Sequence, residues 1–289
     1  MMFTRQKLLR NVLAVGTVSA IVLFQSISTS NAQDVDDQSP LDHFKCYSAK
    51  SLAQGSTVDL MDEFGLEENV FGTRKPWLKP NMLCNPVMKL HDGKEFPIRH
   101  PKEHLVCYKL KGRGMANKKI MISNQFGEEQ RYVVYRQRAL CVPSSKFLVQ
   151  SDGQIDEELQ SDCSLDPLKC PLDHFKCYTL RNFADNLTPS PRINVSLTDQ
   201  FGEEEIKAVV RPRMLCNPAT KWHDDKEFPV LHPDEHLMCY MLKKTKIADK
   251  TVIVANQFGE KQRLYVGASN YLCLPSKMFV VEDEDEGGT

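Results

Sequence analysis

The stretch PLDHFKCY occupies residues 40–47, and the same eight residues recur at positions 171–178. Eight cysteines repeat with it at a fixed offset of 131 or 132 residues. They are Cys46, Cys84, Cys107 and Cys141 in the first half of the chain, and Cys177, Cys216, Cys239 and Cys273 in the second half. An offset that holds over so many positions indicates an internal duplication. The sequence therefore predicts two equivalent halves.

Each half contains a shorter repeat of its own. The first half runs HFKCY, DEFG and MLCNP and then HLVCY, NQFG and ALCVP over residues 43–143, and the second half follows the same order. Apolar residues alternate before each Phe-Gly pair, and β-branched and aromatic residues follow it, which is typical of two strands joined by a hairpin turn. We therefore predict an all-β fold of two tandem disulfide-stapled domains, each a β-sandwich or barrel-like structure with an internal two-fold repeat.

The N-terminus has the features of a secretory signal. Three basic residues precede an apolar run at positions 12–24, and Ser30-Asn31-Ala32 offers small residues for cleavage. The apolar run is shorter than the roughly 20 residues that a bilayer span needs. We predict a signal peptide at residues 1–32, no membrane span after its removal, and a secreted or periplasmic protein.

The duplication also places the domain boundaries. Domain 1 is expected at residues 33–149 and domain 2 at residues 171–282, joined by a polar linker at 150–170 and followed by an acidic tail at 283–289. Each domain holds four cysteines and is in the usual size range for a single core. Each is therefore expected to fold alone.

All ten cysteines are expected to be oxidised, because their number is even and the export signal indicates a compartment that permits disulfides. The simplest pattern closes each short unit on itself, as Cys46–Cys84, Cys107–Cys141, Cys177–Cys216 and Cys239–Cys273. A pattern that links the two units of a domain, as Cys46–Cys141 and Cys84–Cys107, stays open. Cys163 and Cys170, in the linker, are predicted to pair with each other.

These motifs resemble a family of secreted bacterial proteins with a duplicated domain of unknown function, marked by DHFxCY, DQFG, LCNP, HLxCY, NQFG and LCVP. The resemblance covers nearly all of the chain beyond the signal. It implies export, tandem duplication and a β-rich fold, and it implies no particular activity. The long insert between the third and fourth motifs departs from the commoner pattern.

That insert carries most of the histidines. KLHDGKEFPIRHPKEHLVCY at 89–108 recurs as KWHDDKEFPVLHPDEHLMCY at 221–240. Imidazoles bind Zn²⁺ or Cu²⁺ when several converge on one point, so a metal site is one interpretation. Its ligands would come from His91, His100, His104, His223, His232 and His236. The other interpretation, which the residues favour, is structural: a histidine beside a core strand can satisfy a buried backbone carbonyl.

Composition and motifs favour a binding module over an enzyme. The chain has 37 Lys and Arg against 38 Asp and Glu and no basic stripe, which argues against nucleic acid as a partner. It has no CxxC, no GxSxG and no glycine-rich phosphate loop, and we assign no catalytic residue. We expect a non-catalytic binding, structural or surface module for an unknown protein or surface ligand, with no cofactor. The alternative is a metal-binding protein or metal-dependent enzyme that uses the histidine-rich loops.

Overall fold

The computed structural model describes residues 39–51, 54–55, 57–70, 77–111, 114–149, 154, 170–182, 192–243 and 250–281. The predicted signal peptide, the predicted acidic tail and Cys163 lie outside the described residues. Every regular element in the described part is a β-strand, which confirms the all-β prediction. Within the same part, no helix has the length and apolar character needed to cross a membrane.

The strands follow the repeated motifs. Those of the first half are β1 (Phe44–Lys50), β2 (Gln54–Gly55), β3 (Val58–Asp62), β4 (Gly65–Val70), β5 (Trp77–Pro86), β6 (Met88–His91), β7 (Lys94–Phe96), β8 (His104–Lys109), β9 (Gly114–Asn124) and β10 (Gly127–Leu148). Those of the second half are β11 (Phe175–Asn182), β12 (Arg192–Asp199), β13 (Gly202–Pro218), β14 (Thr220–His223), β15 (Lys226–Phe228), β16 (His236–Leu242), β17 (Lys250–Asn256) and β18 (Gly259–Val281).

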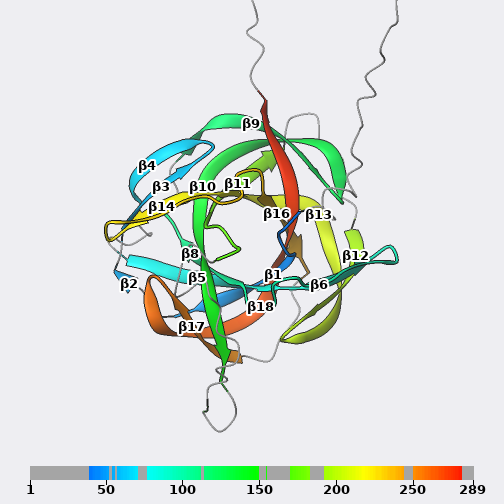
Figure 1. Cartoon of the computed structure of the whole chain (residues 1–289). Helices are drawn as coiled ribbons and strands as arrows, with labels where there is room; N and C mark the ends of the chain where they lie inside the picture. The colour runs from blue at the N-terminus through cyan, green and yellow to red at the C-terminus, as the bar shows by residue number, and fades with distance from the viewer. Residues whose placement is uncertain are drawn as a thin grey trace, which may run out of the picture.

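Antiparallel pairing closes a ring of strands that both halves share. Around the ring the strands are β1, β5, β8, β10, β11, β13, β16 and β18, and β18 pairs back onto β1. The ring crosses from one half to the other at the β10–β11 and β18–β1 pairs. Figure 1 shows these strands arranged around a central axis.

This arrangement refines the predicted domain organisation. The β-rich, barrel-like and disulfide-stapled character is as predicted, but each half supplies four strands of one common ring instead of a closed core of its own. The physical reason is that four strands leave two open edges, and each half pairs its edges with those of the other half. The residue boundaries of the two domains stay a prediction.

The inside of the ring is lined by the repeated cysteines. In each short unit the two cysteines face each other on neighbouring strands, and they form the within-unit disulfides Cys46–Cys84, Cys107–Cys141, Cys177–Cys216 and Cys239–Cys273. Apolar side chains two positions away, such as Phe44 and Met82, point to the same interior because side chains alternate along a strand. The FKCY part of each PLDHFKCY octet is thus a segment of the ring wall.

Four hairpins surround the ring: β3–β4, β9–β10, β12–β13 and β17–β18. All four contact the opposite half, since β9 pairs with the end of β18, β17 with the end of β10, β3 with β14 and β12 with β6. Figure 1 shows β9 and β17 on opposite sides of the ring. The two outer cores therefore mix residues of both halves: Ile122 of the first half packs in a core with Val195, and Val252 of the second half in a core with Val58.

The turn motif that precedes each Phe-Gly pair has one local role. The side chain at its first position accepts a hydrogen bond from the backbone N–H of the phenylalanine, as Asp62 does for Phe64 at 3.3 Å and Asp199 for Phe201 at 2.9 Å. Such Asx turns explain why Asp or Asn begins each motif. The same side chains also accept hydrogen bonds from tyrosines of the opposite half, which sets the position of the candidate site.

Candidate functional site

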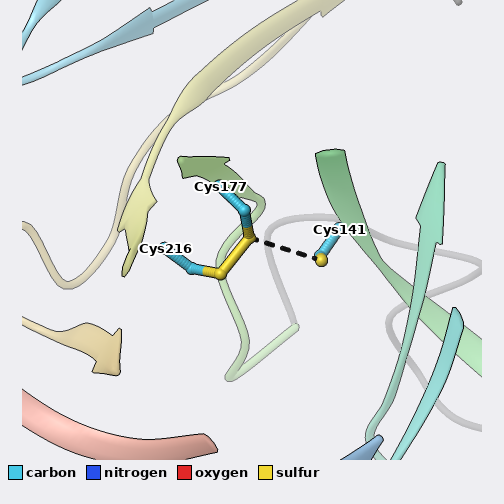
Figure 2. Close-up of side chains that lie close together, drawn as sticks. All are labelled: Cys141, Cys177 and Cys216. Carbon is cyan, nitrogen blue, oxygen red and sulfur yellow. Dashed lines mark hydrogen bonds between the residues drawn. A yellow bond between two sulfur atoms is a disulfide. The ribbon is translucent and has the colours of Figure 1, made fainter. Parts of the chain in front are cut away.

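Three cysteines of the inner ring are the one group of three or more close residues of metal-ligating type among the described residues. Figure 2 shows Cys141, Cys177 and Cys216, whose sulfur atoms lie within 4.8 Å of one another. Cys177 and Cys216 share a disulfide, and Cys141 Sγ lies 3.6 Å from Cys177 Sγ while bonded to Cys107. Metal ions bind thiolates, and a sulfur atom in a disulfide is not one. The cluster is therefore a structural core in the oxidised protein.

Cys170 is also in a disulfide and is buried against the same inner core. Its predicted partner, Cys163, lies outside the described residues. None of the cysteines in the described residues is free. In the oxidised protein these cysteines therefore offer no nucleophile.

The histidines of the two inserts are held by separate partners. His100 and His232 each have Nδ1 beside an aspartate, at 3.6 Å from Asp42 and 3.5 Å from Asp173. Both aspartates also accept the backbone N–H of the histidine at 2.8 Å, so they anchor the loop that carries it. These two histidines belong to loop anchors that repeat with the duplication.

His91 and His223 pack by their ring edges on turn phenylalanines. The ring centroids are 5.6 Å apart for His91 and Phe126 and 5.1 Å apart for His223 and Phe258. Each of these histidines also lies beside the aspartate that follows it in the chain. Together with His100 and His232, they lie apart from any set of three close ligands that the described residues form.

His104 and His236 are buried at matched positions, where β8 and β16 begin. Neither ring nitrogen of His104 has a hydrogen-bond partner, and burial holds the pKa of His104 well below its usual range. Burial also lowers the pKa of His236 to about 4, so this imidazole is neutral near pH 7. None of the six predicted metal ligands belongs to a described group of three, and the metal site stays a prediction without a converged ligand set.

His236 lines a pocket of about 470 Å³ between the two halves. The first half contributes the end of β3 and the turn after it. The second half contributes the end of β13, the starts of β14 and β16, the loop between β15 and β16, and part of β18. The lining residues are Met61, Asp62, Glu63, Pro218, Thr220, Val230, Pro233, Asp234, His236 and Met278. This volume is in the range of small-molecule sites. We call it the acidic pocket, because three of its side chains are carboxylates.

A hydrogen-bonded network fixes the polar wall of the acidic pocket. Asp62 accepts a hydrogen bond from the Tyr178 hydroxyl at 2.7 Å and one from Asn217 Nδ2 at 3.3 Å. The amide oxygen of Asn217 lies 3.1 Å from His236 Nδ1, and because the amide nitrogen donates to Asp62, this oxygen accepts from the imidazole. Lys176 Nζ lies 3.9 Å from Asp62 and 3.1 Å from Glu67.

The network leaves two acceptors facing each other. With its proton on Nδ1, neutral His236 carries a lone pair on Nε2, which lies 3.9 Å from Glu63 Oε2. Burial raises the pKa of Glu63, and the negative charges of Asp62 and Asp234 raise it further. The pKa of Asp62 is also raised by burial, in opposition to Lys176 and the donors Tyr178 and Asn217. A donor placed between His236 and Glu63 would satisfy both.

The duplication supplies a second copy of this network, which we call the lysine site. Asn85 Nδ2 donates to Asp199 at 2.9 Å, and the Tyr47 hydroxyl donates to the same carboxylate at 2.7 Å. The amide oxygen of Asn85 accepts a hydrogen bond from Lys146 Nζ at 2.7 Å. In the acidic pocket, the corresponding oxygen of Asn217 accepts its hydrogen bond from His236 instead. The side chain of Lys146 is fully buried. At the offset of 132 residues, Met278 is the residue that matches Lys146.

Sequence reasoning identified His236 as a candidate ligand but missed the other polar residues of the pocket. The sequence pattern places Asp62 and Glu63 in a hairpin turn and Asn217 in a repeated LCNP motif, and it indicates no further role for them. A signal was present in the sequence, because the pocket lies where the two copies differ: Glu63 matches Gln200, Met278 matches Lys146 and Asp234 matches Lys102. Departures from an internal repeat were therefore more informative than the repeat itself.

Comparison with known proteins agrees with the duplication. Neither a curated protein nor a solved structure matches the chain significantly. Residues 21–143 and residues 145–276 each match one family, described as Repeat of unknown function (DUF7450). Together the two matches cover most of the chain, and their order is the tandem order predicted from the motifs. The chain therefore belongs to the DUF7450 family and contains its repeat twice.

Proposed function

We propose that this protein is a non-catalytic binding module that acts outside the cytoplasm and takes its ligand in the acidic pocket. The observation that carries the proposal is the pocket itself, a cavity of about 470 Å³ with convergent polar groups on an apolar wall. Such pockets are the usual place of ligand binding. The four disulfides of the ring are typical of an oxidising environment, and the N-terminal signal features support secretion or export to a periplasm.

The fixed geometry of the polar wall supports binding. Asp62 is held by Tyr178 and Asn217, and His236 is held by Asn217, so these groups are already oriented before a ligand arrives. A preorganised site loses little conformational entropy when it binds. Apolar side chains such as Val230 and Met278 line the remaining wall and offer surface for an uncharged part of a ligand.

The experiment compares two matched tryptophan substitutions. Val230→Trp fills the acidic pocket, whereas Ile98→Trp places the same side chain at the matched position of the first half. A panel of cationic, neutral and anionic fragments is tested against both variants and the unchanged protein by thermal shift and by NMR. We expect at least one class of fragment to bind the unchanged protein and the Ile98→Trp variant and not the Val230→Trp variant. Equal binding to all three proteins, or binding to none, would contradict the proposal.

A further inference from the structure

The lysine site shows which group this hydrogen-bonded network can hold. Lys146 Nζ donates to the amide oxygen of Asn85, and the ammonium lies 4.6 Å from the centroid of the Phe201 ring. The pKa of Lys146 is lowered by burial to about 7, with the charge of Asp199 acting in the opposite direction. The amide oxygen of Asn85, the charge of Asp199 and the Phe201 ring thus hold a buried lysine nitrogen that the protein itself provides.

The acidic pocket has the same network without that ammonium. Asn217, Asp62 and Tyr178 take the places of Asn85, Asp199 and Tyr47, with the same three kinds of contact. Methionine at position 278 cannot supply a charge or a hydrogen-bond donor. In the acidic pocket, the cavity and His236 occupy the space that the end of the Lys146 side chain occupies in the lysine site.

The two sites differ in charge at three matched positions, and at each of them the acidic pocket has the more negative charge. Glu63 replaces a neutral glutamine, Met278 replaces a lysine, and Asp234 replaces a lysine. With ionised carboxylates and charged lysines, the net charge at these three positions is −2 in the pocket and +2 in the lysine site, a difference of four units. Lys176, the cation that faces the pocket network, is 3.1 Å from Glu67 and 3.9 Å from Asp62, so its charge is shared with a residue outside the pocket lining.

The acceptors of the pocket converge as an ammonium requires. His236 Nε2 and Glu63 Oε2 are 3.9 Å apart, and a nitrogen between them could donate to both at ordinary hydrogen-bond distances of about 2.9 Å. An ammonium has three N–H donors and no acceptor, which matches a wall of acceptors. Val230, Met61 and Met278 supply apolar surface of the kind along which lysine side chains bury their methylene groups.

We propose that the acidic pocket binds a primary alkylammonium group, placed between His236 and Glu63. This inference rests on the proposed function, since it assigns a ligand class to the same pocket. The group has two possible sources, a small free amine or the side chain of a lysine in another protein. Both present the same ammonium and alkyl stem.

The test uses the full oxidised chain and defined probes. Titration calorimetry and NMR measure the binding of n-butylammonium, of n-butanol as a neutral analogue and of tetramethylammonium as a cation without N–H donors. We expect n-butylammonium to bind at least ten-fold more tightly than the other two. Nα-acetyl-lysine-N-methylamide then separates the sources: binding equal to or tighter than that of n-butylammonium supports a protein lysine, and at least ten-fold weaker binding supports a free amine.

Variants locate the bound group. Glu63→Gln should weaken n-butylammonium binding at least ten-fold, and Met278→Lys should abolish it, because the new side chain carries the ammonium into the site. Gln200→Ala, at the position that matches Glu63, is the control and should leave binding unchanged. Unchanged binding in Glu63→Gln, which has little effect on packing because the side chain is 40% exposed, would overturn the inference.

The outcomes separate the ligand class from the proposed function. If another class of fragment binds and Val230→Trp blocks it, while n-butylammonium does not bind, the ammonium inference fails and the binding function stands. If no probe or fragment binds the unchanged protein, both fail. Binding of n-butylammonium that is lost in Val230→Trp and in Glu63→Gln supports both.

Discussion

The hydroxyl of Tyr47, in the first half of the chain, donates a hydrogen bond of 2.7 Å to the carboxylate of Asp199 in the second half. Tyr178 of the second half donates the equivalent hydrogen bond to Asp62 of the first half, also at 2.7 Å. The aromatic rings add to the exchange, because Tyr47 packs edge-on against Phe201 and Tyr178 against Phe64. The motifs CY and DxFG thus recur in both halves as reciprocal contacts between them.

The first prediction concerns these tyrosines. Tyr178→Phe removes a donor from the buried carboxylate of Asp62, and it should lower the free energy of unfolding by about 1–3 kcal/mol. Tyr47→Phe should have a similar effect through Asp199. Chemical denaturation measures both, with Tyr265→Phe as the control, because Tyr265 is 58% exposed. Losses no larger than that of the control would show that the bonds between the halves contribute no stability.

The second prediction concerns the independence of the halves. Residues 33–149 and 171–282, produced separately, should not melt cooperatively, because each holds four of the eight ring strands and lacks one hairpin of its outer core. Produced together, the fragments should associate and regain one cooperative transition. Calorimetry and gel filtration measure this. A sharp transition in either isolated fragment would restore the sequence-based expectation that each half folds alone.

The third prediction concerns the disulfides. Replacing Cys46 and Cys84 together with alanine removes a bridge of 38 residues' separation and should reduce stability by about 3–4 kcal/mol in the chain-entropy model. The matched pair Cys177 and Cys216, with a separation of 39, should show the same loss. Peptide mapping without reduction should find the eight ring cysteines only in the four within-unit bridges. A Cys46 peptide linked to a Cys141 peptide would contradict the assignment.

The fourth prediction concerns acid stability. Burial lowers the pKa of His236 to about 4, so between about pH 6.5 and pH 4 the unfolded chain binds a proton that the folded protein does not. Stability is therefore lost as the pH falls through this window, by about 3 kcal/mol for this residue. The raised pKa values of Asp62 and Glu63 act in the opposite sense. Comparing the denaturation of the His236→Asn variant with that of the unchanged protein over this pH range isolates the contribution of His236. Parallel profiles of unfolding free energy against pH for the two proteins would contradict the prediction.

The fifth prediction concerns Lys221, a buried cation on β14. Lys221 is fully buried, its Nζ has no hydrogen-bond partner, and burial lowers its pKa to about 7. Lys221→Met should stabilise the protein by about 1–4 kcal/mol near pH 7, because the charge is removed from an apolar site. The gain should shrink as the pH rises from about 7 to 10.5, where the unfolded lysine also loses its proton. A less stable variant would mean that the ammonium contributes through the 3.9 Å contact with the Phe228 ring.

The sequence by itself determined the repeat, the strands and the within-unit order of the cysteines. Alternation of apolar residues and the Asp or Asn that begins each turn are local features, and local features are visible in a single chain. The cysteine pattern was visible for the same reason, since the offset of 131 or 132 residues needs no structure to be read. The histidines were also visible, but whether they converge depends on how the loops meet.

Only the tertiary structure decided how the halves meet. Strand period says which side chains share a face, but it does not say which edge pairs with which, and the pairs β18–β1 and β10–β11 that close the ring join separate halves. The acidic pocket depends on that closure, because Glu63 and His236 are 173 positions apart in the chain and 3.9 Å apart in space. Contacts of such sequence separation arise from the packing of both halves, and no local pattern encodes them.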